Sequence, residues 1–463
     1  MIGKLKDIAL AMQGKLYGPG DEELIRSIST DTRTLRPGDL FLALRGEVHD
    51  GHAFLAQAID KGAKGIVISE PGLAEKYMTR DLNIILVDNT LHGLHRLALW
   101  HRQKFDVPVI GITGSNGKTT TKDMVAAVLN EKFNVLKTEG NYNNEIGLPL
   151  TLLKLLPEHE AVVLEMGMRG LGEIDVLCQI ANPTAGVITN IGVTHFELLG
   201  SVENIAKAKG ELLEHIPTSG FALLNGEDEW SHRLGSLCRG KVLFFGFSQQ
   251  AHIKAENVSL GEVSRFDVEA FGKKMNVHLP LPGEHNVLNA LAAAGVGLQL
   301  GLSLEEIASG LNKVKLSAMR LAKVAGINNT IIINDAYNAN PTSTKASLQV
   351  LVSSQGERKI AVLGDMRELG AIEEESHFQI GEYVVQLGID HLIAVGNLAN
   401  FMAEGAICAG MPKEKALAFA DNDGAKRYLR SLLMPGDVIL VKGSRAVKME
   451  EIVNFVTQPE GKE

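Results

Sequence analysis

The segment from Gly111 to Thr120 carries the clearest chemistry in the sequence. It reads GITGSNGKTT, with its last glycine directly before Lys118 and Thr119. Glycines allow backbone N–H groups to turn toward phosphate oxygens, and the start of a following helix favours negative charge. Lys118 can then reach the β- and γ-phosphates, while the Thr119 hydroxyl can bind Mg2+. The pattern predicts a nucleoside triphosphate site formed by Gly114, Ser115, Asn116, Gly117, Lys118, Thr119 and Thr120.

Elements typical of a phosphate site flank this loop. Residues 107–110 form an apolar, strand-like run, and residues 122–131 have a helical pattern. The common phosphate-loop pattern has a glycine five positions before the glycine that precedes the lysine, but Ile112 occupies that place here. This spacing favours a narrower family than the ordinary GTPases or motor proteins.

Two polar residues that follow later strands are candidate metal ligands. Glu165 ends the apolar run 162–164, and a strand-end carboxylate near a phosphate loop can bind Mg2+ together with Thr119. His195 follows the predicted strand 185–191. From the residue alone, a metal ligand, a general base and a hydrogen-bonded surface histidine all remain open for it.

Three further positions allow a functional and a purely structural interpretation. Lys209 lies in a helical stretch, where most lysines are solvated, but a buried neutral lysine can add CO2 and offer carbamate oxygens to Mg2+. Asn286 and Asn289 share one face of a helix start, so they can bind adenine or ribose, or one can cap the helix. Arg320 can clamp a γ-phosphate across a domain gap or remain a solvated surface residue.

Polar loops in the first and last parts of the chain are candidate ligand sites. Asp335 ends a predicted strand and opens the loop 335–341, which is dense in groups able to bind a ligand. In the first part, segments 31–33 and 45–52 surround the predicted strand 40–44. By chemistry alone, their indication of a nucleotide-like ligand is weak.

Composition excludes several classes of function. The net charge of -9 disfavours a broad nucleic-acid surface, which needs a basic patch. The three cysteines show neither a disulfide framework nor metal-ligand spacing, as expected in a reducing compartment. No apolar run approaches the ~18 residues of a membrane span, and the N-terminus lacks the features of a signal peptide. We therefore expect a soluble cytoplasmic protein.

The chain of 463 residues is long enough for about three domains. Strand-like and helix-like stretches alternate along most of it, which favours mostly parallel sheets covered by helices. We predict an α/β protein with domains at 1–85, 86–315 and 316–463. These are a small α/β domain, a central phosphate-loop ATPase domain with a mostly parallel sheet, and a C-terminal Rossmann-like domain.

Taken together and in order, these residues resemble those of the Mur ligases of peptidoglycan synthesis. The shared features are the GxxGxxGKTT loop, a strand-end glutamate, a histidine after the next strand, a helix lysine, a His-Asn-x-x-Asn helix start and an arginine opening the last domain. Here they are the loop 111–120, Glu165, His195, Lys209, His285, Asn286, Asn289 and Arg320. The resemblance covers essentially the whole chain.

Within that family the segments 138–147, 165–169, 335–341 and 362–366 resemble the members that join D-alanyl-D-alanine to UDP-MurNAc-tripeptide. The resemblance implies ATP-dependent amide formation through an acyl phosphate, with small-molecule substrates and a monomeric enzyme. A sister ligase that adds the third amino acid, a ligase similar to folylpolyglutamate synthase and a non-catalytic nucleotide-binding regulator remain as alternatives. The first domain disfavours the folylpolyglutamate type, and no Asp-Asn-Pro-Arg segment typical of the preceding ligase occurs in the last domain.

The resemblance also implies roles for the candidate residues. The catalytic residues would be Lys118, Lys209, His195 and Arg320. ATP would bind the phosphate loop together with Asn286, Asn289, Arg320 and Asp335. Mg2+ would bind Thr119, Glu165, His195 and Lys209, the last as a carbamate. The UDP group would contact Thr32, Arg33, Arg45, Gly46, Asp50 and His52, and the UDP-binding domain would be the first one. The sugar-peptide would lie near Asn143, Asn144 and Glu145, and the incoming dipeptide near Tyr337, Asn338, Asn340 and Ser343.

Overall fold

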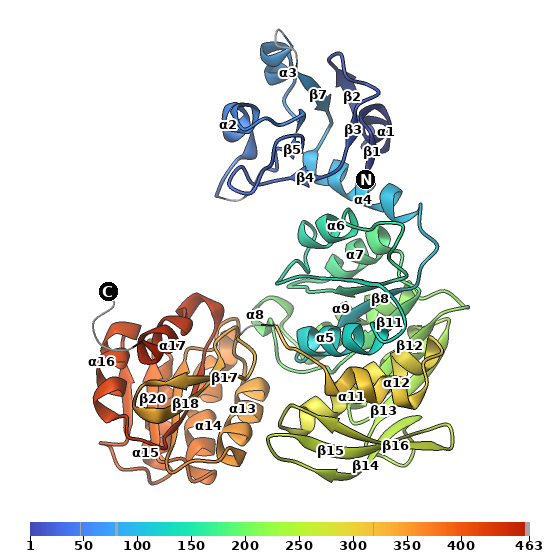
Figure 1. The fold of residues 1–463 in the computed structure, drawn as a ribbon. Coiled ribbons are helices and arrows are strands. Elements are labelled where there is room, and N and C mark those ends of the chain that lie inside the picture. The colour runs from blue at the N-terminus through green and yellow to red at the C-terminus, as the bar shows by residue number, and fades with distance from the viewer. Residues whose placement is uncertain (47, 79–81, 318, 459–463) are drawn as a thin grey trace.

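The computed structural model describes residues 1–46, 48–78, 82–317 and 319–458, which form three α/β domains in chain order (Figure 1). The N-terminal domain lies at one end of the molecule and the middle domain adjoins it. The C-terminal domain packs beside the middle domain rather than in line with it. The predicted fold class is confirmed. The predicted domain boundaries remain predictions.

The N-terminal domain is built on a five-stranded sheet in the order β2-β7-β6-β5-β4. Its parallel centre alternates strands with short helices, as the pattern of apolar runs and turns predicts. The strands of this sheet are β2 (Lys15–Tyr17), β4 (Ile28–Ser29), β5 (Leu40–Leu42), β6 (Gly65–Ile68) and β7 (Asn83–Leu86). The strands β1 (Gly3–Lys4) and β3 (Leu24–Ile25) pair with each other in a separate two-stranded sheet. Its helices are α1 (Leu5–Ala11), η1 (Gly51–Phe54), α2 (Leu55–Asp60) and α3 (Pro71–Tyr77).

Helix α4 (Thr90–Arg102) joins the first two domains. It starts where the Asn89 side chain accepts a hydrogen bond from the His92 N–H, as an N-cap does. One part of it packs on α1, and another on α6 (Gly147–Leu152) and α7 (Glu173–Ala181) of the middle domain. Their apolar side chains form one continuous hydrophobic cluster across the boundary. The two domains therefore share a core instead of meeting at a polar surface.

The middle domain contains a nine-stranded sheet in the order β16-β15-β14-β13-β12-β11-β8-β10-β9. Pairing is parallel from β9 to β14, and β14, β15 and β16 form an antiparallel meander. The strands are β8 (Val109–Thr113), β9 (Val135–Lys137), β10 (Ala161–Glu165), β11 (Ala185–Ile188), β12 (Phe221–Asn225), β13 (Lys241–Gly246), β14 (Ile253–Ser259), β15 (Ser264–Ala270) and β16 (Lys273–Leu279). Because β8, β10 and β11 are parallel neighbours, their carboxyl ends meet at one edge.

Helices cover both faces of this sheet. Helices α5 and α11 pack on each other and share a core with the strands on one face, and α7 and α9 cover the other. Of these, α5 spans Lys118–Leu129, α9 spans Val202–Glu214 and α11 spans Glu284–Gln299. The other helices that follow β11 in this domain are α8 (Phe196–Leu199), α10 (Glu229–Leu234), η2 (Gly235–Leu237) and α12 (Leu304–Asn312).

The C-terminal domain has a six-stranded sheet in the order β17-β18-β22-β19-β20-β21, in which only the pairing of β17 is antiparallel. Separate hydrophobic clusters lie on its two faces, so the domain is doubly wound. The strands are β17 (Ala322–Gly326), β18 (Thr330–Asp335), β19 (Lys359–Gly364), β20 (His391–Val395), β21 (Ala416–Phe419) and β22 (Val438–Lys442). The helices are η3 (Ile327–Asn329), α13 (Pro341–Ser353), η4 (Gly370–Ile372), α14 (Glu373–Gln386), α15 (Ala399–Cys408), α16 (Asn422–Leu432), η5 (Arg445–Val447) and α17 (Glu450–Thr457).

None of the helices in the described part of the chain combines the length and the apolar character that a bilayer crossing requires.

Candidate active site

The predicted phosphate loop follows β8 and ends where α5 begins. Gly117 is the N-cap of α5 with a φ of 80°, and a Cβ there would lie 2.7 Å from Asn289 Oδ1. Asn190 braces the loop, because its Oδ1 accepts from the Asn116 N–H at 3.0 Å and its carbonyl accepts from the Ser115 N–H at 2.9 Å. Sequence reasoning missed Asn190, although its place just after β11 was a usable signal.

Lys118 lies at the start of α5 with its ammonium folded back onto the loop. Its Nζ donates to the Gly114 carbonyl at 2.6 Å. Burial lowers the pKa of Lys118 to about 8, with the Glu165 carboxylate acting against this shift and Arg320 adding to it. A phosphate group would replace the carbonyl with a charged acceptor, which strengthens the hydrogen bond and favours the ammonium form.

Thr119 and Glu165 meet as predicted, although they lie on different elements. The Thr119 hydroxyl donates to Glu165 Oε2 at 2.7 Å, and Asn143 Nδ2 donates to Oε1 at 2.7 Å. Glu165 is only 3% exposed. Both of its oxygens accept from neutral donors, so among the described residues its charge has no direct cationic partner. Hydroxyl, amide and carboxylate oxygens around a buried carboxylate without an ion-pair partner fit a hard cation such as Mg2+.

His195 is held by a residue from the C-terminal domain. Its Nδ1 lies 2.5 Å from Glu368 Oε2, and Arg169 reaches the other oxygen of Glu368 at 3.4 Å. The His195 partner lowers the pKa of Glu368 by hydrogen bonding, against the opposing effect of burial. Sequence reasoning missed Glu368, which has a φ of 65° in a loop without a recognisable motif. The predicted metal ligand His195 is thus also an interdomain contact.

Lys209 lies on α9 and is only 1% exposed. Burial and then the nearby positive charge of Lys118 lower the pKa of Lys209 well below its usual value. The side chain is therefore a buried amine rather than the solvated charge that its helical context made plausible. It does not line the cavity described below.

Asn286 and Asn289 lie on the first turns of α11, as their spacing predicted, and both are buried. Asn289 Oδ1 accepts from the Thr121 hydroxyl at 3.1 Å, which ties α11 to α5. Asn286 Nδ2 donates to the Pro282 carbonyl at 2.7 Å. The neighbouring His285 has its pKa lowered to about 4 by burial, with Asp335 opposing the shift and Lys442 adding to it.

Polar residues of the C-terminal domain complete the site. The Arg320 guanidinium lies 4.3 Å from the centre of the Tyr337 ring, a cation–π contact. Asp335 Oδ2 accepts from Ser347 and from Lys442 at 2.7 and 2.5 Å. Asn340 begins α13 with a capping box that includes Ser343, and its Nδ2 donates to Asn116 Oδ1 of the phosphate loop at 2.7 Å.

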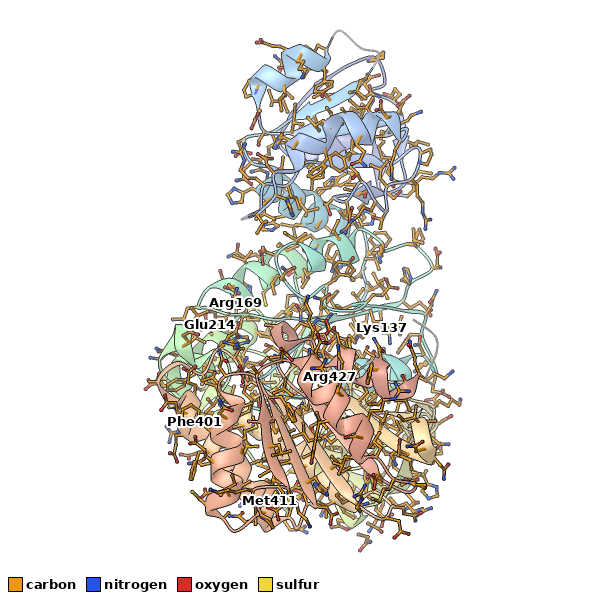
Figure 2. All side chains as sticks on the ribbon, turned by 90° about the vertical axis from the view of Figure 1, so that its left-hand side faces the viewer. Lys137, Arg169, Glu214, Phe401, Met411 and Arg427 are labelled. Atoms are coloured by element: carbon orange, nitrogen blue, oxygen red, sulfur yellow. The ribbon has the colours of Figure 1, made fainter. Side chains whose placement is uncertain are left out.

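These groups surround one cavity of about 710 Å³ between the middle and C-terminal domains. Most predicted residues of both domains line it: Ser115, Asn116, Gly117, Lys118, Thr119, Thr120, Asn143, Asn144, Glu145, Glu165, His195, Asn286, Asn289, Arg320, Asp335, Tyr337, Asn338, Asn340 and Ser343. The volume is in the range of cofactor and substrate sites. Figure 2 views the molecule from the side of the C-terminal domain, with Arg169 labelled near the boundary with the middle domain.

The predicted UDP residues form a separate polar group in the N-terminal domain and do not line this cavity. Thr32 donates to Gln57 Oε1 at 2.7 Å, and the exposed Arg33 pairs with Asp31. Arg45 bridges Asp50 and Glu70. His52 Nδ1 lies 2.6 Å from Asp50, and its Nε2 accepts from the Ser69 N–H at 3.0 Å.

Asp50, His52 and Glu70 are also close enough to form a three-ligand metal group. The Arg45 guanidinium already supplies the positive charge between the two carboxylates, and both nitrogens of His52 are engaged. The group is better explained as an ion-pair network. Gly46 lies beside it, whereas position 47 of the predicted 45–52 loop is outside the described residues.

Comparisons with known proteins follow the three domains. Family models described as Mur ligase family catalytic domain, Mur ligase middle domain and Mur ligase glutamate ligase domain match residues 24–101, 112–297 and 319–445. The UDP-N-acetylmuramoyl-tripeptide–D-alanyl-D-alanine ligase of Bacillus subtilis is 40% identical, over 97% of this chain and 97% of its own. The chain belongs to the Mur ligase family. The resemblance inferred from the ordered motifs is thereby confirmed.

Two solved Mur ligase structures share the whole architecture. MurF from Acinetobacter baumannii is 32% identical and superposes with a TM-score of 0.89 over 99% of both chains. MurF from Thermotoga maritima, solved in complex with ADP, is 29% identical with a TM-score of 0.80 over 93% of this chain and 97% of its own. A nucleotide in that relative agrees with the phosphate-loop geometry found in this Mur ligase.

Proposed function

We propose that the protein joins D-alanyl-D-alanine to UDP-N-acetylmuramoyl-tripeptide, using ATP and releasing ADP and phosphate. The relatives with this name cover nearly the whole chain at up to 40% identity. The observation that carries the proposal is the shared cavity, in which the phosphate loop faces the polar loop 335–340 of another domain. Such an arrangement suits a reaction that transfers a phosphoryl group and then joins two further substrates.

The chemistry requires activation, because a carboxylate is a poor acyl donor to an amine. Transfer of the γ-phosphoryl group to the terminal carboxylate of the tripeptide forms an acyl phosphate and ADP. The dipeptide amine then attacks the carbonyl carbon, the C–O bond to phosphate breaks, and the amine proton is lost. Lys118 and Arg320 neutralise charge on the transferred group. Bound Mg2+ would supply further charge neutralisation, held by Thr119 and Glu165.

We assign the substrates by domain. ATP binds the loop 114–120, with Asn286, Asn289, Arg320 and Asp335 around it, and the UDP group binds the polar group of the N-terminal domain. The sugar-peptide passes Asn143, Asn144 and Glu145. The dipeptide is received by Tyr337, Asn338, Asn340 and Ser343. Apart from Gly114, these groups of the two larger domains line the cavity of a single chain, which supports a monomeric enzyme. We place the enzyme in the cytoplasm, where its proposed substrates are small soluble molecules.

Lys209 is assigned as a carbamate that completes a second metal site with His195. Support comes from its burial and from its lowered pKa, because only the neutral amine can add CO2. The carbamate would turn a buried neutral amine near Lys118 into an anion, which the Lys118 ammonium attracts. It would also supply hard oxygen ligands.

Phosphate release from ATP and Mg2+ tests the function. The assay contains UDP-MurNAc-tripeptide with either meso-diaminopimelate or L-lysine as third residue, with and without D-alanyl-D-alanine. We expect sustained release only when the dipeptide is present, together with a UDP-MurNAc-pentapeptide by mass. Release with UDP-MurNAc-dipeptide and a free amino acid would instead identify a sister ligase. Nucleotide binding without amine-dependent release would identify a regulator.

A further inference from the structure

The Arg320 guanidinium contacts an aromatic ring rather than a carboxylate. Its central carbon lies 4.3 Å from the centre of the Tyr337 ring, and both residues line the cavity. Within the described part of the chain, Arg320 has no ion-pair partner and its N–H groups have no hydrogen-bond acceptor. A cation–π contact uses the negative face of the ring and leaves the five N–H donors of a guanidinium available. Arg320 therefore brings its full charge and its donors to the cavity.

Tyr337 lies in a loop that is anchored on both sides of the ring-bearing residue. Asp335 accepts from Ser347 at 2.7 Å and from Lys442 at 2.5 Å. Lys442 also donates to the Asn338 carbonyl at 2.9 Å, so one buried ammonium spans the backbone before and after the ring. The loop that carries the ring is thus held by the C-terminal domain itself, without a contribution from a ligand.

Asp335 also fixes the backbone beside Arg320. The Leu321 N–H donates to Asp335 Oδ1 at 3.2 Å. Leu321 has a φ of 52°, a left-handed conformation that a non-glycine residue keeps only when its surroundings hold it. Leu321 is adjacent to Arg320, and Asp335 lies two residues before Tyr337. One carboxylate therefore anchors the backbone on both sides of the cation–π contact.

The charges around this contact explain why a ring suits the site better than an acid. The charge of Arg320 contributes to the lowered pKa of Lys118, so the two cations are near enough to repel each other. Burial raises the pKa of Tyr337, with Arg320 opposing the shift, so the phenol is neutral at physiological pH. A carboxylate in its place would form an ion pair with Arg320 that a phosphate would have to break. A neutral ring holds the cation without this competition.

We propose that Tyr337 is a positioning residue whose ring holds the Arg320 guanidinium at the cavity without neutralising it, so that Arg320 meets the transferred phosphoryl group with its N–H donors free. The ring then contributes to the first chemical step, the transfer of the γ-phosphoryl group, in addition to its assigned place near the dipeptide. This inference rests on the proposed function.

The test compares Tyr337→Phe, which keeps the ring, with Tyr337→Leu, which removes it. We expect Tyr337→Leu to lower kcat for amide formation by about 10- to 30-fold, the scale of a desolvated cation–π contact. Tyr337→Phe should stay within about threefold of wild type. Equal losses in the two variants would assign the effect to the hydroxyl and overturn the proposal. A change confined to KM for D-alanyl-D-alanine, with kcat unchanged, would also overturn it.

A double-variant cycle shows whether the ring acts through Arg320. In an Arg320→Ala background, Tyr337→Leu and Tyr337→Phe should have the same kcat, because no guanidinium remains for the ring to hold. A further 10-fold loss from Tyr337→Leu in that background would overturn the proposal. If Tyr337→Leu does not fold, Tyr337→Met takes its place in both comparisons.

Trp230→Leu is the matched control. The Trp230 ring carries the Arg233 guanidinium at 4.9 Å on α10, and neither residue lines the cavity. Its loss should leave kcat within about twofold of wild type. A loss of kcat as large as that of Tyr337→Leu would show that removal of an aromatic ring anywhere in the protein has this effect, and would overturn the proposal.

Nucleotide affinity gives a readout that needs no peptide substrate. By calorimetric titration with Mg2+, Tyr337→Leu should weaken binding of a non-hydrolysable ATP analogue by about 10-fold and binding of ADP by less than about twofold. Tyr337→Phe should change neither. Equal weakening for both nucleotides would contradict a role at the γ-phosphate. A wild-type protein without dipeptide-dependent phosphate release would refute the proposed function, whereas these affinities would still decide whether the ring positions Arg320.

Discussion

Desolvation lowers the pKa of two lysines, Lys118 and Lys209, whose surroundings differ. Lys118 keeps carbonyl partners in the phosphate loop and has a pKa of about 8, so it remains able to bind a phosphate as a cation. Lys209 is almost completely buried, and burial and the nearby charge of Lys118 lower its pKa well below the usual value. A lowered pKa thus agrees with both proposed roles, phosphate binding for Lys118 and carbamate formation for Lys209.

From the proposed carbamate at Lys209 we predict that Lys209→Ala lowers amide formation by about 10- to 100-fold, and that added acetate or formate restores part of it. Lys207→Ala is the control, because Lys207 lies on the same helix but is exposed and pairs with Glu203. Steady-state rates with and without the short acid measure the effect. Full activity of Lys209→Ala, or equal stimulation of both variants by acetate, would rule out the carbamate.

At His285 we predict a specific contribution to acid sensitivity. Its pKa is lowered from 6.5 to about 4 in the folded protein, mainly by burial. Between these values the unfolded chain binds a proton that the folded chain does not, so stability is full above pH 6.5 and falls toward pH 4. Denaturant midpoints at pH 7.5 and pH 5 should differ less in His285→Gln than in wild type. An identical difference in both proteins would contradict the assigned protonation.

Sequence predicted the residues of the site that recur at strand ends and missed those that depend on tertiary contact. Thr119 and Glu165 could be paired because β8 and β10 place their ends together. Glu368 could not be found, since it meets His195 across 173 residues and two domains. Its left-handed backbone conformation leaves no mark in the sequence because the residue is not glycine.

At the scale of elements, helix starts carry much of the site's geometry. Helices α5 and α7 both begin after a glycine N-cap in the left-handed region, with φ values of 80° and 83°. A Cβ on Gly117 would collide with Asn289, whereas a Cβ on Gly172 would meet open space. Alanine substitutions at the two positions therefore distinguish the effect of backbone strain from the effect of damage to the phosphate loop.

We predict that Gly117→Ala and Gly172→Ala each cost about 1 kcal/mol in unfolding free energy because alanine is strained at positive φ. Only Gly117→Ala should also weaken ADP binding, by about 10-fold or more, because the loop or Asn289 must shift. Denaturation and calorimetric titration measure the two effects. Equal nucleotide affinity in both variants would show that the Gly117–Asn289 contact is not needed.

Element order was accessible from the sequence because apolar runs of strand length alternate with helical stretches. Alternating polar and apolar residues over 252–278, for example, predict a β-rich segment, and the strands β14 to β16 lie there. The role of α4 was not accessible, because an amphipathic pattern does not reveal that a helix serves two domains. Likewise, nothing in the sequence around Ser317 predicts that its N–H donates a hydrogen bond to Asp123 Oδ2 on α5.

At the scale of the whole molecule, the described residues form a hydrophobic core that the first two domains share, whereas the C-terminal domain has separate cores. One hydrophobic cluster joins the N-terminal and middle domains, while the C-terminal sheet has two clusters of its own. The C-terminal domain meets the middle domain largely through polar contacts such as His195–Glu368 and Asn340–Asn116. Such interfaces permit relative movement of domains.

We predict two transitions in calorimetric unfolding without nucleotide, one for the C-terminal domain and one for the rest. ATP analogue with Mg2+ should raise both temperatures and bring them closer, because the ligand contacts residues of both domains. Scanning calorimetry with proteolytic mapping of the first fragment released identifies the order. A single cooperative transition in the absence of nucleotide would show that the polar interface is stronger than inferred.

The hydrophobic core shared across α4 fixes the distance between the N-terminal and middle domains. Because the N-terminal and middle domains cannot slide past each other without exposing that cluster, the polar group around Arg45 stays at a constant separation from Lys118. On the proposed assignment, the UDP end of the substrate binds in the N-terminal domain, so this separation fixes how far along the substrate the phosphate loop can act. We therefore expect the completed tripeptide to present its carboxylate at the phosphate loop, and a shorter precursor to bind without being activated.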